Sequence, residues 1–177
     1  MSNITIQEGD ITSAEVDAIV NAANPKMVGG GGVDGAIHRA AGPKLLEACL
    51  RVKPHDGIRC RVGESRITEA GELKARYVIH TVGPRFHYDE EPEKLLSSSY
   101  YCSLRLAIDN ECSSIAFPAI SCGAYGYPLT EAADIAIRQC SLAEFRELQI
   151  RFYLYGEQSY RVWERRLDGG FNSEDWP

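Results

Sequence analysis

The chain has 177 residues, of which 44% are hydrophobic and 25% are charged. These fractions are typical of a globular protein and exclude a chain that is disordered throughout. The length predicts one domain over residues 1–167, followed by an acidic, glycine-containing tail over residues 168–177. The net charge of −6 argues against general binding of nucleic acid or of an anionic membrane, but it still permits a small anionic ligand.

The sequence shows no segment typical of secretion or of a membrane span. The N-terminal residues lack a basic segment followed by an apolar one, so we expect no signal peptide. The longest uncharged run, residues 112–130, contains Pro118 and Pro128, which are typical of loops rather than of a membrane helix. We therefore expect a cytoplasmic protein.

Six cysteines are scattered along the chain, at positions 49, 60, 102, 112, 122 and 140, and none forms a C-x-x-C pair. No pair of histidines has the helical spacing of metal ligands. In a cytoplasmic protein, this pattern predicts reduced thiols that pack mainly as small hydrophobic side chains. The sequence therefore predicts neither a metal site nor a bound cofactor.

Strands and helices alternate along the predicted chain. Apolar segments with strand periodicity are expected over residues 3–7 and 16–20, and a helical apolar face over residues 35–51 is interrupted at Gly42-Pro43. The later elements are expected as strands over 64–68 and 77–82, a polar loop over 83–92, a helix over 93–112, a strand over 114–118, a helix over 130–145, a strand over 150–155 and a helix over 160–167. This order predicts an α/β domain with helices on both faces of a sheet. We expect the tail to fray, although Phe171 and Trp176 can dock.

The most unusual segment contains four consecutive glycines, Gly29–Gly32, ahead of a helix. Glycines allow a ligand to approach the backbone, and free N–H groups at a helix start favour phosphate. The pattern Gly30-x-Gly32-x-x-Gly35 matches a dinucleotide fingerprint, but residues 21–28 separate it from the preceding strand, so that interpretation fails. A flexible surface loop is the alternative.

A second loop rich in glycine and hydroxyl groups covers residues 118–128, again between a predicted strand and a helix. Two such loops meet at the carboxyl edge of a sheet, where ligands usually bind. Across residues 24–34 and 118–127 the only cationic side chain is Lys26. A diphosphate between these loops would therefore be bound mainly by backbone N–H groups and helix starts.

Four motifs in this order resemble the macrodomain family, and within it the MacroD-type bacterial hydrolases of ADP-ribosyl groups and O-acetyl-ADP-ribose. The motifs are Gly9-Asp-Ile-Thr12, Val20-Asn-Ala-Ala-Asn24, Gly29–Gly32 with Val33-Asp34, and Pro118-Ala-Ile-Ser121-x-Gly123-x-Tyr125-Gly126. The resemblance covers nearly the whole chain, from Ile4 to Leu167. It implies a three-layer α/β/α sandwich with a central mixed sheet and a cleft for ADP-ribose.

The resemblance implies that Asn24 and Asp34 are the catalytic residues. Asn24 has an amide that suits the distal ribose hydroxyls, and Asp34 would orient or activate a water near the distal ribose. Asp34 has a structural alternative, because it can simply be a carboxylate at a helix N-terminus. Asn21 is expected to brace the loop, and His38 is expected to be structural.

The resemblance also implies a set of ligand contacts. Asp10 would accept a hydrogen bond from adenine, although an Asp there can simply cap a turn. Tyr125 would cover the distal ribose, and Tyr155 would flank the adenine. The complete predicted binding set is Asp10, Ile11, Gly30, Gly32, Val33, Ser121, Cys122, Gly123, Ala124, Tyr125, Gly126 and Tyr155.

Cys122 departs from the family pattern, in which Thr is common at this position. We expect helix-start donors to lower the pKa of this thiol and make it sensitive to oxidation. A nucleophilic Cys122 is a second interpretation, but the sequence places no His or acid beside it.

Two functions remain open at this point. The first is hydrolysis of ADP-ribose esters, either mono-ADP-ribose on acidic side chains of proteins or O-acetyl-ADP-ribose, by a monomer without a cofactor. The second is a non-catalytic module that only recognises ADP-ribose. The pairing of Asn24 with Asp34 resembles the hydrolytic branch. A third possibility, an interaction protein that uses the acidic loop 88–93, has no partner indicated by the sequence.

Overall fold

The computed structural model describes residues 3–169. Its strands are β1 (Ile4–Glu8), β2 (Ala18–Ala22), β3 (Ser65–Glu69), β4 (Tyr77–Thr81), β5 (Ser114–Phe117) and β6 (Gln149–Leu154). Its α-helices are α1 (Gly32–Ala41), α2 (Pro43–Leu50), α3 (Pro92–Asp109), α4 (Leu129–Cys140) and α5 (Glu157–Asp168), and short 3-10 helices lie at η1 (Ile11–Ser13) and η2 (Ala143–Phe145).

The strands form one mixed sheet in the order β1-β6-β5-β2-β4-β3. All neighbouring pairs are parallel except β3 with β4, which is antiparallel. Parallel neighbours need crossover connections, which the intervening helices supply. The carboxyl ends of β1, β2, β4, β5 and β6 therefore lie at one edge of the sheet.

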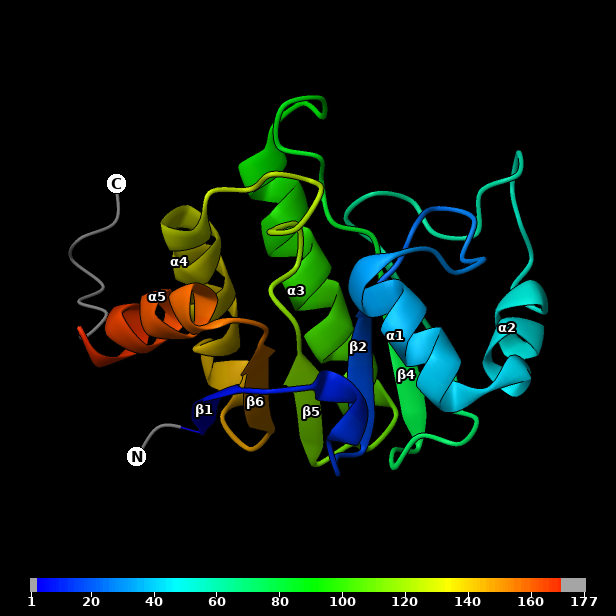
Figure 1. Cartoon of the computed structure of the whole chain (residues 1–177), viewed down its shortest axis with the longest axis horizontal. Coiled ribbons are helices and arrows are strands. Elements are labelled where there is room, and N and C mark those ends of the chain that lie inside the picture. Colours follow the sequence, from blue (N-terminus) through cyan, green and yellow to red (C-terminus); the bar gives the residue numbers. More distant parts are fainter. Residues whose placement is uncertain (1–2, 170–177) are drawn as a thin grey trace.

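Two hydrophobic cores lie on opposite faces of the sheet. One core packs α3, α4 and the α5 residue Trp163 against residues such as Ile115 and Phe152. The other packs α1 and α2 against residues such as Ile19 and Val78. Figure 1 shows the sheet between the pair α1–α2 and the pair α4–α5. The predicted three-layer sandwich with a mixed central sheet is confirmed.

Most predicted elements are present, with ends shifted by a few residues. The break at Gly42-Pro43 is confirmed, because Gly42 ends α1 with a φ of 79° and Pro43 begins α2. The helix predicted over residues 130–145 instead ends at Cys140, and the separate turn η2 follows. Leu142, with extended backbone angles, separates the two.

The strand predicted to end at Val20 extends to Ala22. Its pairing with β4 continues through Asn21↔His80 and Ala22↔Thr81. Our prediction ended the strand at the first polar residue, but Asn21 is fully buried and its amide has hydrogen-bond partners. This correction places Asn21 inside the sheet.

The predicted tail lies mostly outside the described residues. Asp168, which we assigned to it, is the last residue of α5. Phe171 and Trp176, which we considered able to dock, lie outside residues 3–169. Within residues 3–169, no helix combines the length and the apolar character needed to cross a membrane.

Candidate functional site

The candidate site is built from the segments that leave the carboxyl ends of the parallel strands. Asp10 follows β1, Tyr155 follows β6, and Gly83 follows β4. The segment of residues 23–31, called here the glycine loop, joins β2 to α1, and the 118–128 loop joins β5 to α4. Because β2 and β5 are parallel neighbours, these two loops leave adjacent strands at the same edge of the sheet.

Helix α1 begins within the run of glycines. Its N-cap is Gly31, and no side chain caps its N-terminus. The first hydrogen bond of the helix runs from Gly35 N to Gly31 O over 3.2 Å. The N–H groups of the earlier residues in the first turn therefore have no partner within the helix and point outward from its N-terminus. Backbone donors of this kind at a helix start bind anions. Gly32 and Val33 therefore offer the backbone N–H donors that our predicted phosphate contacts require.

Asp34 lies in the first turn of α1 and is only 5% exposed. Its Oδ1 accepts a hydrogen bond of 2.8 Å from Asn21 Nδ2 and lies 3.5 Å from His38 Nε2. A Cβ at Gly30 would lie 3.3 Å from Asp34 Oδ2 and 3.6 Å from Asn24 Nδ2. The backbone of Gly30 therefore lies beside Oδ2 and beside Asn24.

Burial raises the pKa of Asp34 above its ordinary value. The hydrogen bond from Asn21 and the neighbouring His38 act in the opposite direction, because both favour the charged carboxylate. A carboxylate with a raised pKa is a better proton acceptor near neutral pH than an ordinary Asp. The structure thus gives Asp34 both a fixed orientation and a useful basicity.

Asn24 holds the glycine loop in shape. Its Nδ2 donates to Gly29 O over 2.8 Å, and its Oδ1 accepts from Val28 N over 3.4 Å. Within residues 3–169, Nδ2 uses only one of its two hydrogens in this way, so the amide has a second donor to offer. The structure brings Asn24 close to Asp34 through Gly30, as expected for two groups that act on one substrate.

Asn21 and His80 form a polar cluster beneath Asp34 that sequence reasoning missed. Asn21 Nδ2 lies 3.3 Å from His80 Nδ1, and His80 Nε2 lies 2.9 Å from Thr68 Oγ1. Asn21 braces Asp34 rather than the loop, contrary to our prediction. The β2–β4 register alone could have revealed this contact, because it pairs Asn21 with His80.

His38 lies on the same face of α1 as Asp34, one turn further along. Its imidazole also lies under the glycine loop, because a Cβ at Gly29 would be 3.5 Å from His38 Cδ2. Gly29 has a φ of 83°, and this left-handed backbone favours glycine. His38 therefore packs under the loop and lies beside the Asp34 carboxylate.

Asp10 caps the short helix η1. Its Oδ1 accepts from Thr12 N over 2.9 Å and from Thr12 Oγ1 over 2.8 Å. The turn-capping alternative is therefore observed, but it uses only one carboxylate oxygen. Oδ2 accepts no hydrogen bond within the described part of the chain, and Asp10 is exposed. The neighbouring Ile11 is buried against the α1–α2 side of the sheet.

The 118–128 loop offers backbone donors rather than reactive side chains. The N–H groups of Gly123, Ala124 and Tyr125 donate to no acceptor within residues 3–169. Cys122 N instead donates to Ala119 O, and Gly126 N donates to Gly123 O. Of the residues that we predicted as ligand contacts in this loop, Cys122 and Gly126 therefore use their N–H groups to shape the turn.

Ser121 is the most constrained residue of the 118–128 loop. It has a left-handed φ of 67°, and its buried Oγ has no hydrogen-bond partner within residues 3–169. Its backbone O accepts a bond from Tyr127 N over 2.9 Å. Unfavourable backbone angles combined with an unsatisfied buried hydroxyl are typical of functional sites.

Gly83, which follows β4, is a site residue that we did not predict. A Cβ at this position would lie 2.2 Å from Ser121 Oγ and 2.6 Å from Ile120 Cγ2. Glycine is therefore required here by close packing against the 118–128 loop. The next contact along this segment is a hydrogen bond of 2.9 Å from Phe86 N to Tyr125 O, so the 83–91 segment supports the loop.

Our prediction for the thiol of Cys122 is wrong. Burial raises its pKa to about 12, whereas we expected helix-start donors to lower it. Its Sγ lies 3.5 Å from the backbone oxygen of Ile120, and its own N–H is used within the turn. Burial outweighs the helix effect, and the thiol is a poor nucleophile.

Tyr125 and Tyr155 occupy different environments. Tyr125 is half-buried, and its carbonyl joins the 118–128 loop to the 83–91 segment. Tyr155 is 94% exposed directly after β6. An exposed aromatic ring next to the carboxyl edge of a sheet can stack on a planar ligand without any rearrangement of the core.

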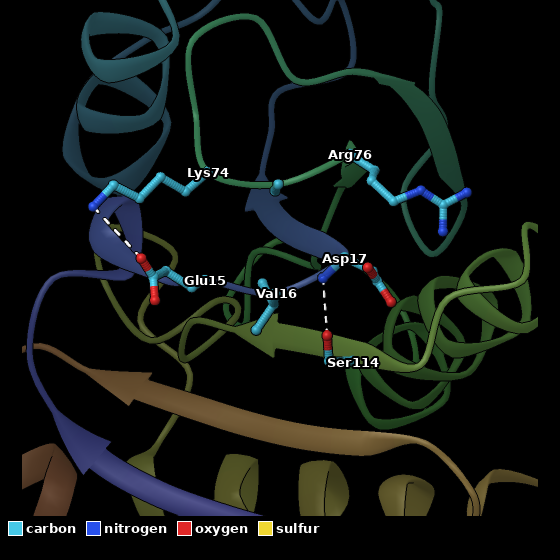
Figure 2. Close-up of a pocket in the computed structure, with 7 residues that line it drawn as sticks. Glu15, Val16, Asp17, Lys74, Arg76 and Ser114 are labelled. Carbon is cyan, nitrogen blue, oxygen red and sulfur yellow. Dashed lines mark hydrogen bonds and ion pairs between the residues drawn. The ribbon is translucent and has the colours of Figure 1, made fainter.

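A shallow groove at the opposite edge of the sheet differs from this site. It has a volume of about 390 Å³ and lies beside the residues that precede β2 and β4. Figure 2 shows Lys74 Nζ 3.7 Å from Glu15 and the backbone N of Asp17 donating to Ser114 Oγ over 2.9 Å. The Asp17 carboxylate accepts from Ser113 N and Oγ. We therefore do not assign the ligand site to this groove.

The cysteines and acidic residues form no cluster suited to a metal. Within residues 3–169, no group of three or more His, Cys, Asp or Glu side chains is arranged to hold an ion. All six cysteines are free thiols, and Cys49, Cys60, Cys112 and Cys140 are buried. The site within residues 3–169 offers the carboxylates of Asp10 and Asp34, the imidazole of His38, amides and backbone N–H groups.

Comparison with known proteins matches these observations. The model of the macro domain family matches residues 20–136. The chain is 57% identical over 167 residues to a macro domain-containing protein of Vibrio parahaemolyticus, covering 94% of this chain and 98% of that protein. It is 50% identical over 170 residues to a protein of Escherichia coli named O-acetyl-ADP-ribose deacetylase, covering 94% and 96%.

Solved structures show the same fold. The Oceanobacillus iheyensis macrodomain with ADP superposes with a TM-score of 0.87 at 42% identity, covering 94% of this chain and 90% of that chain. The Trypanosoma brucei macrodomain in complex with ADP-ribose gives a TM-score of 0.81 at 39% identity, covering 93% and 69%. These matches confirm the resemblance that the four motifs indicated.

Proposed function

Since this chain belongs to the macro domain family, we propose that it is a hydrolase of ADP-ribose esters. We propose O-acetyl-ADP-ribose as one substrate and mono-ADP-ribose on acidic side chains of proteins as the other. Support comes from relatives about 50% identical that are named O-acetyl-ADP-ribose deacetylase. The observation that carries the proposal is the buried Asp34 carboxylate, held by Asn21 at the start of α1 and close to Asn24.

In this proposal the diphosphate lies between the two loops. The first-turn N–H groups of α1, at Gly32 and Val33, bind one phosphate, and the free N–H groups of residues 123–125 bind the other. These donors are fixed before the ligand arrives, so little reorganisation is needed. Because they are backbone groups, the site can bind a dianion within a protein of net charge −6.

The two ends of the ligand are assigned to different elements. Adenine lies near β1 and β6, where Asp10 Oδ2 accepts from its exocyclic amine and Tyr155 flanks the ring. The distal ribose lies near α1, where the free N–H of Asn24 binds a hydroxyl and Tyr125 limits the access of water. Asp10→Ala is expected to weaken ADP-ribose binding about 10-fold, since a charge-assisted hydrogen bond is lost.

Water is the second reactant. For the protein ester, water attacks C1″ of the distal ribose, and the carboxylate of the modified side chain leaves. For the acetyl ester, water attacks the acyl carbon, the bond from that carbon to the ribose oxygen breaks, and the products are acetate and ADP-ribose, whose ribose oxygen is the leaving group. In both reactions Asp34 orients the water and accepts its proton, which is then available to the leaving oxygen. The substrate phosphate can assist, since a carboxylate is a modest base.

The raised pKa of Asp34 sets the sign of the pH dependence. Only the ionised carboxylate accepts a proton, so activity falls when the pH falls through the pKa of Asp34. Because burial raises this pKa, the acidic limb of kcat/KM should lie above the ordinary pKa of an Asp side chain, which is about 4.

The direct test is turnover of both substrates by the full chain. O-acetyl-ADP-ribose is mixed with the protein and acetate release is followed, and in parallel a protein mono-ADP-ribosylated on Glu or Asp is assayed for free ADP-ribose. We expect release in both assays. Tight ADP-ribose binding without turnover of either substrate would instead assign the chain to the non-catalytic modules that recognise ADP-ribose.

A further inference from the structure

A chain of buried polar groups runs from Asp34 across the strands β2, β4 and β3. Asp34 Oδ1 lies 2.8 Å from Asn21 Nδ2 on β2, and the same Nδ2 lies 3.3 Å from His80 Nδ1 on β4. The other ring nitrogen, His80 Nε2, lies 2.9 Å from Thr68 Oγ1 on β3. Asn21 and His80 are fully buried, and Thr68 is only 8% exposed. Buried polar groups are costly unless each is satisfied, so a chain of them beneath a reactive carboxylate calls for an explanation.

The direction of each hydrogen bond can be assigned from the end of this chain. Thr68 has one hydroxyl hydrogen, which it donates to Glu69 O over 3.0 Å. Thr68 Oγ1 is therefore the acceptor for His80, and His80 carries its hydrogen on Nε2. Burial lowers the pKa of His80 to about 3, so the ring is neutral and Nδ1 is a bare acceptor.

A bare Nδ1 fixes the orientation of the Asn21 amide. The two hydrogens of Asn21 Nδ2 point to His80 Nδ1 and to Asp34 Oδ1. The other end of the amide, Oδ1, is buried and accepts no hydrogen bond from the described residues. The amide is thus oriented only by the two bonds that Nδ2 donates, and His80 supplies one of them.

On this basis, and resting on the hydrolytic function proposed above, we propose that His80 is a positioning residue for the reaction: acting through Asn21, it keeps Asp34 ionised and its Oδ2 directed to the substrate. Protonation of Asp34 on Oδ1 would remove the acceptor for Asn21. If the Asn21 amide then reversed, its oxygen would face His80 Nδ1, which would have to carry a hydrogen. Thr68 would then have to donate to His80 Nε2 instead of to Glu69 O. The neutral Nε2–H form of His80 opposes that change.

Other titratable groups around this chain come from three elements. On α1, His38 Nε2 lies 3.5 Å from Asp34 Oδ1, and its ring centroid lies 6.5 Å from that of His80. On α2, Cys49 Sγ lies 3.6 Å from His80 Nε2. From the segment before β3, Cys60 Sγ lies 3.9 Å from the backbone oxygen of His80. Burial raises the pKa of each of these thiols to about 11, so both remain neutral at the pH of the assay.

Two substitutions at position 80 separate the roles of the two ring nitrogens. In His80→Asn, the carboxamide oxygen stands as many bonds from Cβ as Nδ1 does, so the acceptor for Asn21 is kept. In His80→Gln, the amide nitrogen stands as many bonds from Cβ as Nε2 does, so the donor to Thr68 is kept and the acceptor for Asn21 is lost. The two variants therefore exchange contacts: His80→Asn keeps the acceptor for Asn21 and loses the donor to Thr68, whereas His80→Gln keeps that donor and loses the acceptor that the proposal requires.

Thr81→Val is the matched control for lost stability. Thr81 is the next residue on β4 and is also fully buried, but it faces α3, where Oγ1 lies 3.4 Å from Ser99 O. Its hydroxyl also accepts from Ser65 Oγ and lies 2.9 Å from Glu64 O. This substitution removes buried hydrogen bonds next to His80 without touching Asn21 or Asp34.

The experiment measures kcat and KM for O-acetyl-ADP-ribose against pH, together with ADP-ribose affinity and the free energy of unfolding. We expect His80→Gln to lower kcat about 10- to 100-fold, with KM and affinity within about 3-fold of wild type, and to move the acidic limb up by about one pH unit. His80→Asn should keep the wild-type limb, and so should Thr81→Val.

Thr68→Val covers the case in which His80→Gln fails to fold. It keeps His80 but removes the acceptor for Nε2–H, so the acidic limb should move in the same direction by a smaller amount. The proposal would be overturned if the acidic limb of the pH profile stayed at its wild-type position in both His80→Gln and Thr68→Val. It would also be overturned if Thr81→Val moved the acidic limb as far as these variants do.

A second readout does not depend on turnover. The Asp34 carboxyl carbon can be titrated by NMR in the wild-type protein and in each variant. Its pKa should rise in His80→Gln and remain at the wild-type value in His80→Asn, and an unchanged value in His80→Gln would refute the role of His80. A wild-type protein that fails to hydrolyse the ester would refute the proposed function while leaving this titration valid.

Discussion

The glycine loop and the 118–128 loop leave neighbouring parallel strands, yet they differ in what holds them. The glycine loop combines backbone bonds, in which Arg59 N and Cys60 N donate to Pro25 O, with a side-chain bond from Asn24 to Gly29 O. Asp34, which follows the loop in α1, is held by Asn21 from the sheet. The 118–128 loop is fixed by backbone bonds within itself and by close packing of Ser121 against Gly83. One loop carries reactive side chains on a buried polar network, and the other presents bare N–H groups.

This difference predicts a division of labour. Changes that disturb the glycine loop should act mainly on the rate of hydrolysis, because they move Asn24 and Asp34. Changes that disturb the 118–128 loop should act mainly on ligand affinity, because they move phosphate donors. Two glycines outside the loops allow this to be tested, since each is required by close contact with one loop only.

Gly35→Ala should give the largest effect. A Cβ at Gly35 would lie 2.4 Å from Gly30 O, so the glycine loop must shift relative to α1. We expect kcat to fall about 100-fold, because a small displacement of a reactive group has a large effect on rate, and affinity for ADP-ribose to fall less than 10-fold. Equal losses in rate and affinity would contradict the division between the loops.

Gly83→Ala should give the converse result. The added Cβ clashes with Ser121 Oγ and Ile120, and we expect ADP-ribose affinity to fall about 10- to 30-fold with an unfolding free energy reduced by about 1–3 kcal/mol. Calorimetric titration and urea denaturation provide the measurements. Gly123→Ala is the control for stability, since a Cβ at Gly123 meets nothing within 4 Å. A large loss of stability in this control would show that the loop tolerates no side chain, whatever its contacts.

The free energy of unfolding should depend on acidic pH through a group beneath Asp34 rather than through the 118–128 loop. The pKa of His80, beneath the glycine loop, falls to about 3 on burial, so the unfolded chain binds a proton that the folded chain does not. Stability from this group is complete above pH 6.5 and is lost as the pH falls toward 3, by at most about 1.4 kcal/mol per pH unit. His80→Asn should flatten this dependence in urea denaturation between pH 6.5 and 4.5. Wild-type acid sensitivity in the variant would show that His80 is not its source.

Cys122 should give the smallest effect. Burial raises its pKa to about 12 from an ordinary value of 9.0, so alkylation of the folded protein should be at least about 10-fold slower than that of an exposed thiol. Cys122→Ala should change turnover less than 2-fold, because the side chain only packs the loop. Rapid alkylation with loss of activity would mean that the 118–128 loop carries a reactive group after all.

Local patterns predicted much of this architecture. The alternation of strands and helices, the break at Gly42-Pro43 and the place of Asp34 after the glycines depend on residues close together in sequence, and each is present. Helix ends were less accurate, because capping by backbone alone leaves no side-chain signal. Neither Gly31 before α1 nor Gly156 before α5 makes a side-chain capping bond, and both helices begin three residues earlier than we predicted.

The missed residues depend on contacts that are distant in sequence. Asn21 lies 59 positions from His80, and only the register of β2 against β4 brings the two together. Gly83 looks like an ordinary loop glycine until Ser121 is placed against it. Cys122 shows the same limit for electrostatics, since its burial is set by neighbours from elsewhere in the chain, and burial decides its pKa.

The central claim is that Asp34 acts on the bond being broken rather than on the binding of ADP-ribose. Asp34→Asn keeps the shape of the side chain and removes its charge and basicity. We predict that kcat for O-acetyl-ADP-ribose falls at least about 100-fold, while the Kd for ADP-ribose stays within about 3-fold of wild type. A variant that binds ADP-ribose as wild type does and still hydrolyses the ester at the wild-type rate would contradict the account.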